Sequence, residues 1–273
     1  MTVERLKILR KAKRVVIKIG TSTIIKDSGK VNIYNLERIA KIVSDIHDQG
    51  REVVIVSSGA IGMGASKFNL QEKPQRLEDK QAMAAIGQGL LMHMYENIFF
   101  KYGVTVAQML LTRSDFEDSI RQCNTRNTFD ALFKYKVIPI VNENDTVAVE
   151  EIVFGDNDTL SAVVSILIKA DILIMLSDTD GLYTGDFRKN KNVKKISFVE
   201  DINEEIESFA CGVGSSFGTG GMRTKISAAK LATARGIAVA IIKGKKPEQI
   251  MGIIQGKNEG TIFLPKKITE GQN

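Results

Sequence analysis

Acid and amide side chains gather in two short clusters, at Asn142–Asp145 and at Asp156–Asp158. The first cluster follows the apolar run Val137–Val141, and the second precedes a helical pattern that begins at Thr159. Carboxylates and amides at the exit of a strand and the entry of a helix can hold an ammonium group or position a cation. In open α/β folds, ligands bind at the carboxyl edge of the sheet, where both clusters are expected.

These residue types suggest roles. Asp145 and Asp156 are candidates for holding an ammonium group, and Asn142 and Asn157 for binding a carboxylate or sharing hydrogen bonds. Asp158 directly precedes the helical pattern, so taken alone it is equally well explained as a helix N-cap. Capping does not explain seven acid or amide residues in two turns, and the pair of clusters therefore favours a binding site.

A lysine near the end of a buried strand is a further candidate. Lys18 lies in the sequence VVIKIGTS, within the apolar run Val15–Ile19. A buried ammonium group is costly unless it meets an anion, although a lysine on an edge strand could extend to water. The apolar neighbours favour an ammonium that faces an anion. Gly20, Thr21 and Ser22 then offer backbone and hydroxyl donors for a phosphate.

Two glycine-rich segments could also approach an anion. In Val53–Gly64 a strand runs into two serines and three glycines, which fits an anion-binding turn or simply a tight strand-to-helix turn. In Phe217–Lys225, FGTGGMRTK, glycines precede a helix that carries a lysine in its first turns. This arrangement can cradle a polyphosphate, and the alternative is a flexible loop. Neither segment matches GxGxxG or the Walker P-loop.

Strand and helix patterns alternate along the chain. Apolar runs predict strands at Arg14–Ile19, Val53–Val56, Thr105–Leu111, Val137–Val141, Ile172–Leu176, Ala238–Ile242 and Thr261–Leu264. Periodicity and capping predict helices at Asn35–Gln49, Leu77–Tyr102, Asn124–Lys134, Thr159–Lys169, Met222–Arg235 and Pro247–Gln255. The apolar runs are continuous, so we expect a mainly parallel sheet covered by helices on both faces. A soft boundary is expected near Ala170.

Composition narrows the class of protein. A chain of 273 residues with 43% hydrophobic and 26% charged residues fits one large domain or two closely joined lobes. Two cysteines, no apolar run of ~18 residues and no signal peptide indicate a cytoplasmic protein without a membrane span. Sparse aromatics argue against a nucleic-acid partner. His47 and His93 are expected on surfaces or in packing, and no protein-built metal site is expected.

Seven motifs together resemble the amino-acid kinase family and, within it, the glutamate 5-kinase (γ-glutamyl kinase) branch. They are KIGTS, SSGAIGMG, QMLLTRSDF, NENDTVA, GDNDTLSA, LSDTDGLY and GTGGMRTK, and they span about Val15 to Leu264. The resemblance implies a three-layer α/β/α sandwich around a mainly parallel sheet of about eight strands. It also implies one kinase domain over residues 1–273, without the C-terminal PUA domain of longer relatives. Its glutamate-binding lobe would span about 1–170 and its ATP-binding lobe about 171–265.

The resemblance further implies ATP-dependent phosphorylation of the L-glutamate side chain, the first step of proline biosynthesis, with Mg²⁺ arriving on the nucleotide. Lys18 and Lys225 would contact the phosphoryl groups, and Asp158 would orient both lysines. The expected glutamate site comprises Ser58, Asp145 and Asn157, with Gly59, Ala60, Asn142 and Asp156 close by. The expected ATP site comprises Lys18, Ser177, Asp178, Thr219, Gly220, Gly221, Met222, Arg223, Thr224 and Lys225.

This chemistry suits the chain, because a glutamate side chain with a pKa near ~4.3 is already an anionic nucleophile at neutral pH. No general base is then required. One alternative is a kinase of another small carboxylate, a carbamate or a nucleoside monophosphate. Another is a regulatory or nucleic-acid-binding protein on the same fold. The resemblance also suggests a dimer or tetramer, and L-proline as a possible inhibitor. A glutamyl-phosphate reductase would be a possible partner for the labile product.

Overall fold

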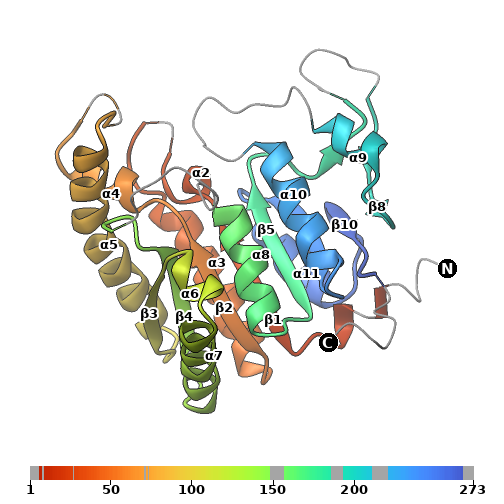
Figure 1. The fold of residues 1–273 in the computed structure, drawn as a ribbon, viewed down its shortest axis with the longest axis horizontal. Helices are drawn as coiled ribbons and strands as arrows, with labels where there is room; N and C mark the ends of the chain where they lie inside the picture. The colour runs from red at the N-terminus through yellow and green to blue at the C-terminus, as the bar shows by residue number, and fades with distance from the viewer. Residues whose placement is uncertain are drawn as a thin grey trace.

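The structure is a computed structural model that describes residues 6–7, 9–26, 28–70, 72, 74–147, 157–185, 193–210 and 221–266. Three expected site residues, Asp156, Thr219 and Gly220, lie outside these ranges. Figure 1 shows a central sheet with helices on both of its faces. None of the helices in the described ranges is long and apolar enough to cross a membrane.

The central sheet has eight strands in the order β3-β4-β2-β1-β5-β9-β10-β8. Their bounds are β1 Arg14–Ile19, β2 Glu52–Ser57, β3 Val106–Leu111, β4 Ile138–Glu143, β5 Ile172–Ser177, β8 Phe198–Val199, β9 Ala238–Lys243 and β10 Thr261–Phe263. All neighbouring strands are parallel except β9 and β10. A separate antiparallel pair joins β6 (Leu182–Tyr183) to β7 (Lys195–Ile196). The expected mainly parallel sheet of about eight strands, flanked by helices, is confirmed.

Helices α3, α5 and α11 cover one face, and α7, α8 and α10 cover the other (Figure 1). Their bounds are α3 Ile33–Asp48, α5 Leu77–Phe100, α7 Ser119–Lys134, α8 Asn157–Leu167, α10 Met222–Thr233 and α11 Glu248–Ile254. Four shorter helices are α2 Thr21–Ile24, α4 Ala60–Lys67, α6 Ser114–Glu117 and α9 Glu204–Phe209. The helical patterns expected from the sequence therefore correspond to the six helices that cover the sheet.

Several element boundaries differ from the sequence expectation. Strand β4 continues through Asn142 to Glu143, so the first two polar residues of the first cluster belong to the strand. Helix α8 begins at Asn157 instead of Thr159, and Asp158 therefore lies inside its first turn instead of before it. Hydrophobic periodicity alone missed these ends because the polar residues there are paired by tertiary hydrogen bonds. The same reason makes a simple N-cap reading of Asp158 wrong.

Helices α4 and α5 approach each other closely at Gly87. A Cβ atom on Gly87 would lie 1.8 Å from the Ala60 carbonyl oxygen, whereas a Cβ on Gly89 would meet no heavy atom within 4 Å. Backbone oxygen cannot move aside as a flexible side chain can. We therefore expect Gly87→Ala to lower the free energy of unfolding by about 1–3 kcal/mol or more, because the two helices must separate.

The matched control is Gly89→Ala on the same helix. Here the added methyl group meets open space, so the change should stabilise the protein by about 0.5–1 kcal/mol through the higher helix propensity of alanine. Urea unfolding of the two variants measures both effects. Equal stability of the two variants would show that α4 and α5 do not pack as described.

Candidate active site

Three charged side chains from distant parts of the chain meet at the carboxyl end of the central strand β1. Lys18 Nζ lies 2.6 Å from Asp158 Oδ1, and Lys225 Nζ lies 3.0 Å from Asp158 Oδ2. The side chain of Asp158 is fully buried, and those of the two lysines are each 6% exposed. Two ammonium groups and one carboxylate carry a net positive charge, which favours an incoming anion.

The alternation of side chains along β1 explains why Lys18 meets Asp158 and Lys225. Val15, Ile17 and Ile19 pack in the core beneath α3 and α5, whereas Val16 packs in the core beneath α8 and α10. Lys18 shares the Val16 face because side chains alternate along a strand. Helix α8 brings Asp158 to that face, and α10 brings Lys225. The hydroxyl of Thr224 lies 2.8 Å from Asp158 Oδ2 and adds a further hydrogen bond.

A chain of amide side chains lies beside this charged cluster, at the ends of β2 and β4. Asn157 Nδ2 donates to the Ser57 carbonyl oxygen at 3.0 Å, to Ser58 Oγ at 2.9 Å and to Asn142 Oδ1 at 2.9 Å. Asn142 Nδ2 in turn donates to Gln88 Oε1 at 2.9 Å. Buried polar groups need such partners, so the network fixes the orientation of each amide.

The turn between β2 and α4 lies next to the amide side chains of Asn142 and Asn157. The Ser58 N–H donates to the Ile19 carbonyl oxygen at 3.0 Å, which ties the turn to the strand that carries Lys18. Gly59 has φ of 102°, a left-handed conformation that favours glycine. Ala60 follows as the first residue of α4. The structure therefore brings the expected residues Ser58, Gly59 and Ala60 next to the amide network.

Two carboxyl groups at the end of β4 have raised pKa values. Burial raises the pKa of Asp145 from 3.8 to about 6. Burial, and secondarily the charge of Asp145, raises the pKa of Glu143 above its ordinary value. Within the described ranges no lysine, arginine or histidine forms an ion pair with Asp145. A desolvated carboxylate without a protein cation is suited to receive a cationic group from a ligand.

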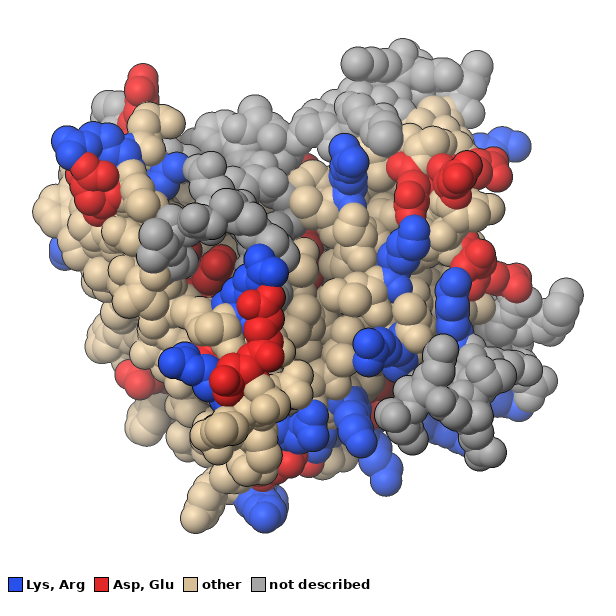
Figure 2. Space-filling view, in the orientation of Figure 1, with Lys and Arg blue, Asp and Glu red and all other residues tan. Residues whose placement is uncertain are grey.

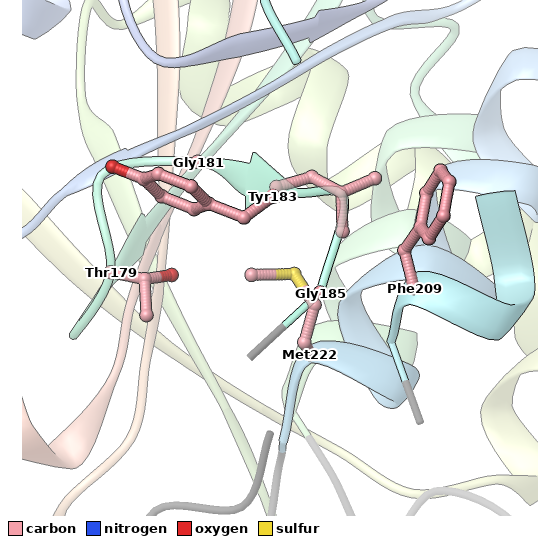
Figure 3. Close-up of a pocket in the computed structure, with 7 residues that line it drawn as sticks. Thr179, Gly181, Tyr183, Gly185, Phe209 and Met222 are labelled. Atoms are coloured by element: carbon pink, nitrogen blue, oxygen red, sulfur yellow. The ribbon is translucent and has the colours of Figure 1, made fainter. Parts of the chain in front are cut away.

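A pocket lies on the other side of β1, beyond the end of β5. It is lined by Thr179, Gly181, Leu182, Tyr183, Gly185, Phe209 and Met222. In Figure 3 the Met222 side chain lies between Thr179 and Phe209, with the Tyr183 ring nearby. At the end of β5, Ser177 Oγ donates to Asp178 Oδ1 at 3.1 Å. The walls of this small pocket are largely apolar.

The structure thus joins most of the expected site residues into two groups. Asn142, Asn157 and Ser58 share hydrogen bonds, and Lys18, Lys225 and Asp158 share ion pairs. Asp145 follows two residues after β4. Gly221, Met222, Arg223 and Thr224 lie at the start of α10, where Met222 lines the pocket and Arg223 is exposed.

The sequence reasoning missed Gln88 and the pocket residues Thr179, Leu182, Tyr183 and Phe209. A signal for Gln88 was present, because it occupies the buried stripe of α5, four residues after Ala84 and three before Leu91. A polar residue in such a stripe indicates a buried hydrogen bond. Phe209 had no comparable signal, because only the packing of α9 near α10 brings it to the pocket.

Charge on the visible face in Figure 2 is mixed. Lysine and arginine side chains are interspersed with aspartate and glutamate side chains over α7, α9 and α10. Within the described ranges, no group of three or more His, Cys, Asp or Glu residues is arranged to hold a metal ion.

Comparisons with known proteins show the family of the chain. The family model described as "Amino acid kinase family" matches residues 13–243. The chain is 52% identical over 262 residues to a protein of Clostridium acetobutylicum named glutamate 5-kinase. The aligned residues cover 96% of this chain and 98% of that protein. The chain is 49% identical to the protein of the same name from Clostridium tetani, with the same coverage. It is 52% identical to that of Moorella thermoacetica, covering 95% of this chain and 68% of that protein.

Two solved structures have a similar fold. A UMP kinase from Bacillus anthracis superposes with a TM-score of 0.64 at 17% identity, covering 94% of this chain and 97% of the other. An isopentenyl phosphate kinase from T. acidophilum superposes with a TM-score of 0.59 at 18% identity. The superposition covers 92% of this chain and 99% of the other. At these identities the likeness concerns the fold alone.

Proposed function

The chain belongs to the amino acid kinase family, and on that premise we propose that it transfers the γ-phosphoryl group of ATP to the side-chain carboxylate of L-glutamate. The products would be L-glutamyl 5-phosphate and ADP, in the first step of proline biosynthesis from glutamate. The observation that carries the proposal is the buried Lys18–Asp158–Lys225 cluster between an acid-amide site and an apolar pocket. Relatives named glutamate 5-kinase, 52% and 49% identical over nearly the whole chain, support it.

The strand order supports a proposal that the two substrates bind on opposite sides of β1. Strands β2 and β4 lie on one side and carry Ser58, Asn142 and Asp145 at their ends, which makes this the acceptor side. Strands β5 and β9 lie on the other side, next to the apolar pocket. We propose that the nucleotide binds on this side and that its phosphates extend along the start of α10 toward Lys18. The acceptor side then belongs to a lobe of about 1–170 and the nucleotide side to about 171–265.

The chemistry needs charge stabilisation more than proton transfer. At neutral pH the side-chain carboxylate of glutamate is an anion that attacks the phosphorus atom directly, so no general base is required. The transition state for phosphoryl transfer is loose, with negative charge spread over the phosphoryl oxygens. Lys18 and Lys225 offset this charge in a buried setting, where a preorganised cation is most effective. Asp158 is a positioning residue that holds both ammonium groups at one point.

Mg²⁺ bound to the nucleotide would reduce the negative charge that the acceptor carboxylate approaches. Mg²⁺ in such sites keeps several waters and binds phosphate oxygens with one or two carboxylates. Asp178, exposed at the exit of β5, is a carboxylate of the kind such an ion uses. We propose that it faces the nucleotide-bound ion.

Asp145 is expected to bind the free α-ammonium group of the acceptor. An N-acylated glutamate lacks this cation and would leave the desolvated carboxylate unpaired, so it should be rejected. We expect Asp145→Asn to raise the KM for L-glutamate about 10- to 100-fold, in line with loss of a charged hydrogen bond, and to leave the KM for ATP nearly unchanged. Steady-state kinetics with each substrate varied in turn measures both constants.

The same variant should be more stable at alkaline pH. An aspartate whose folded pKa of about 6 lies above its ordinary value of 3.8 binds more protons in the folded state between these values. The free energy of unfolding therefore falls as the pH rises from about 4 to about 6. Asp145→Asn removes this penalty, so its Tm should exceed that of the wild type at pH 8 and equal it at pH 4. A lower Tm at pH 8 would mean that Asp145 has a cationic partner in the folded protein.

The activity itself is tested with purified protein, ATP, Mg²⁺ and L-glutamate, with hydroxylamine to trap the acyl phosphate. Glutamate-dependent hydroxamate and ADP are expected. N-acetyl-L-glutamate, carbamate and UMP serve as the panel that separates this activity from other kinases of the same fold. Turnover of a panel member without turnover of L-glutamate would overturn the proposal, and salt-dependent RNA binding without ATP turnover would point to a non-catalytic role.

Regulation and assembly are proposed from the same chemistry. L-proline carries an α-ammonium and an α-carboxylate, so it would compete with L-glutamate at the acceptor side. The acyl phosphate is labile in water, so a glutamyl-phosphate reductase is the partner expected to consume it. We also propose a cytoplasmic homo-oligomer, whose size analytical ultracentrifugation would establish.

A further inference from the structure

We propose that Gln88 determines acceptor specificity by donating a hydrogen bond from Nε2 to the α-carboxylate of the bound amino acid. This inference rests on the proposed function and names a recognition residue that the sequence motifs do not contain. The observation behind it is that Gln88 Nε2 is buried and has no hydrogen-bond partner among the described residues. Gln88 as a whole is only 7% exposed.

The orientation of the Gln88 amide follows from two backbone anchors. The Ser57 carbonyl oxygen can only accept, so the Asn157 atom 3.0 Å from it must be the amide nitrogen. The backbone N–H of Glu143 can only donate, so the atom of Asn142 that lies 2.9 Å from it must be the oxygen. The other Asn142 atom, Nδ2, then donates to Gln88 Oε1. Gln88 Nε2 is therefore the end of the network that remains available to donate.

Close packing holds this group in place. Gly87 lies against the Ala60 carbonyl at the start of α4, where no side chain fits between the helices. Seven residues beyond Gln88 along α5, about two helical turns, the Tyr95 hydroxyl lies 2.9 Å from Ser57 Oγ at the end of β2. Gln88 is thus fixed between the start of α4 and the end of β4. It is positioned by the packing of α5 against α4 and by side-chain hydrogen bonds to the ends of β2 and β4.

The position selects the α-carboxylate over the side-chain carboxylate. Gln88 contacts Asn142 on β4, which is separated from β1 by β2. Two strand spacings put β4 about 10 Å from β1, the strand that carries Lys18. The reacting carboxylate must lie near Lys18, so the opposite end of an extended glutamate reaches toward β4. Asp145 at the same strand end would take the ammonium, and Gln88 the carboxylate beside it.

Burial explains why a ligand oxygen is expected at Gln88. A buried N–H without a partner is destabilising, and natural proteins keep such groups mainly where a ligand or a water satisfies them. An anionic acceptor forms the stronger, charge-assisted hydrogen bond. The amide network also carries no net charge, so it does not repel a carboxylate. A donor fixed in this way would form a hydrogen bond with the α-carboxylate and would not bind the ammonium group.

The test compares L-glutamate with its α-amide, which keeps the ammonium and the side-chain carboxylate but has a neutral group at the α position. Three enzymes are measured: the wild type, Gln88→Met and Gln88→Glu. The control is Asn97→Asp, which makes the same amide-to-carboxylate change as Gln88→Glu on the exposed side of α5. The readouts are the KM for L-glutamate, the inhibition constant of the α-amide, the KM for ATP and the Tm.

In Gln88→Met the KM for L-glutamate should rise about 10- to 100-fold, whereas the inhibition constant of the α-amide should change several-fold less. In Gln88→Glu a carboxylate faces the α-carboxylate, so the preference for L-glutamate should fall further or reverse in favour of the α-amide. The KM for ATP should stay within about twofold in both variants, and Asn97→Asp should behave as the wild type.

If the KM for L-glutamate and the inhibition constant of the α-amide rose by the same factor, the inference would be overturned and Gln88 would have a purely structural role. An unchanged KM for L-glutamate would overturn it too. These results differ from failure of the proposed function, in which the wild type itself would not phosphorylate L-glutamate.

Discussion

Replacing Lys225 by methionine should lower kcat about 10²–10³-fold while changing the KM for L-glutamate by less than about threefold. The lysine offsets charge that develops on the phosphoryl group, so its loss is felt in the transition state more than in the bound acceptor. Methionine keeps most of the side-chain volume. Asp158 retains Lys18 at 2.6 Å in this variant, so the fold should persist. Single-turnover kinetics would confirm that the slow step is phosphoryl transfer.

Lys230→Met is the matched control for this change. Lys230 is on the same helix, but its side chain is 58% exposed and is paired with Glu207 at the surface. We expect kcat of the control to equal that of the wild type. Lys18→Met should behave like Lys225→Met, because both ammonium groups contact the same carboxylate. Equal increases in the KM for L-glutamate and decreases in kcat would show that the lysines bind the acceptor instead.

Asp158→Asn should remove activity and also lower the free energy of unfolding by about 3–5 kcal/mol. The change leaves two buried ammonium groups without the carboxylate that each contacts at 2.6 and 3.0 Å. Asparagine has nearly the same shape, so the effect reports charge and not volume. Differential scanning calorimetry or urea unfolding measures the loss.

ATP provides a second readout for Asp158→Asn. If the phosphates approach the two lysines, nucleotide binding supplies the missing negative charge, so saturating ATP should raise the Tm of the variant more than that of the wild type. Asp201→Asn is the control, because Asp201 is exposed and forms a surface ion pair with Lys266, so the Tm of this variant should change little. Wild-type stability in Asp158→Asn would mean that the cluster does not form.

The acid-amide clusters are a clear case of what sequence reasoning could and could not predict. Their residue types and their places after a strand and before a helix were sufficient to predict a ligand site at the carboxyl edge of the sheet. Whether Asp158 was a helix cap or a partner of lysines was not decidable from spacing. Its partners Lys18 and Lys225 lie in distant segments, and only the packing of α8 against both β1 and α10 brings the three side chains together.

Lys18 shows the same division. Its apolar neighbours predicted a buried strand lysine that needs an anion, and the structure supplies Asp158 as that anion. The strand period assigned Lys18 to the face of Val16, but the identity of the helix on that face depended on the connections. Gln88 is the converse case. Its place in a buried helical stripe was visible in the sequence, but the orientation of its buried amide follows from hydrogen bonds of Asn142 and Asn157, which lie far from it in the chain. Only these contacts leave Gln88 Nε2 without a hydrogen-bond partner among the described residues.

Local patterns, then, were enough for the fold class, the family, seven strands of the central sheet and the six helices that cover it, because hydrophobic periodicity and short motifs are properties of neighbouring residues. They did not predict the short elements β6, β7, β8, α2, α6 and α9, and α7 begins at Ser119 instead of Asn124. The strand order, the burial of charge at Asp158 and the buried Gln88 donor that has no partner among the described residues come from contacts between residues far apart in the chain. Such contacts depend on how whole elements pack, and the free energy of a buried charge or amide depends on every group around it.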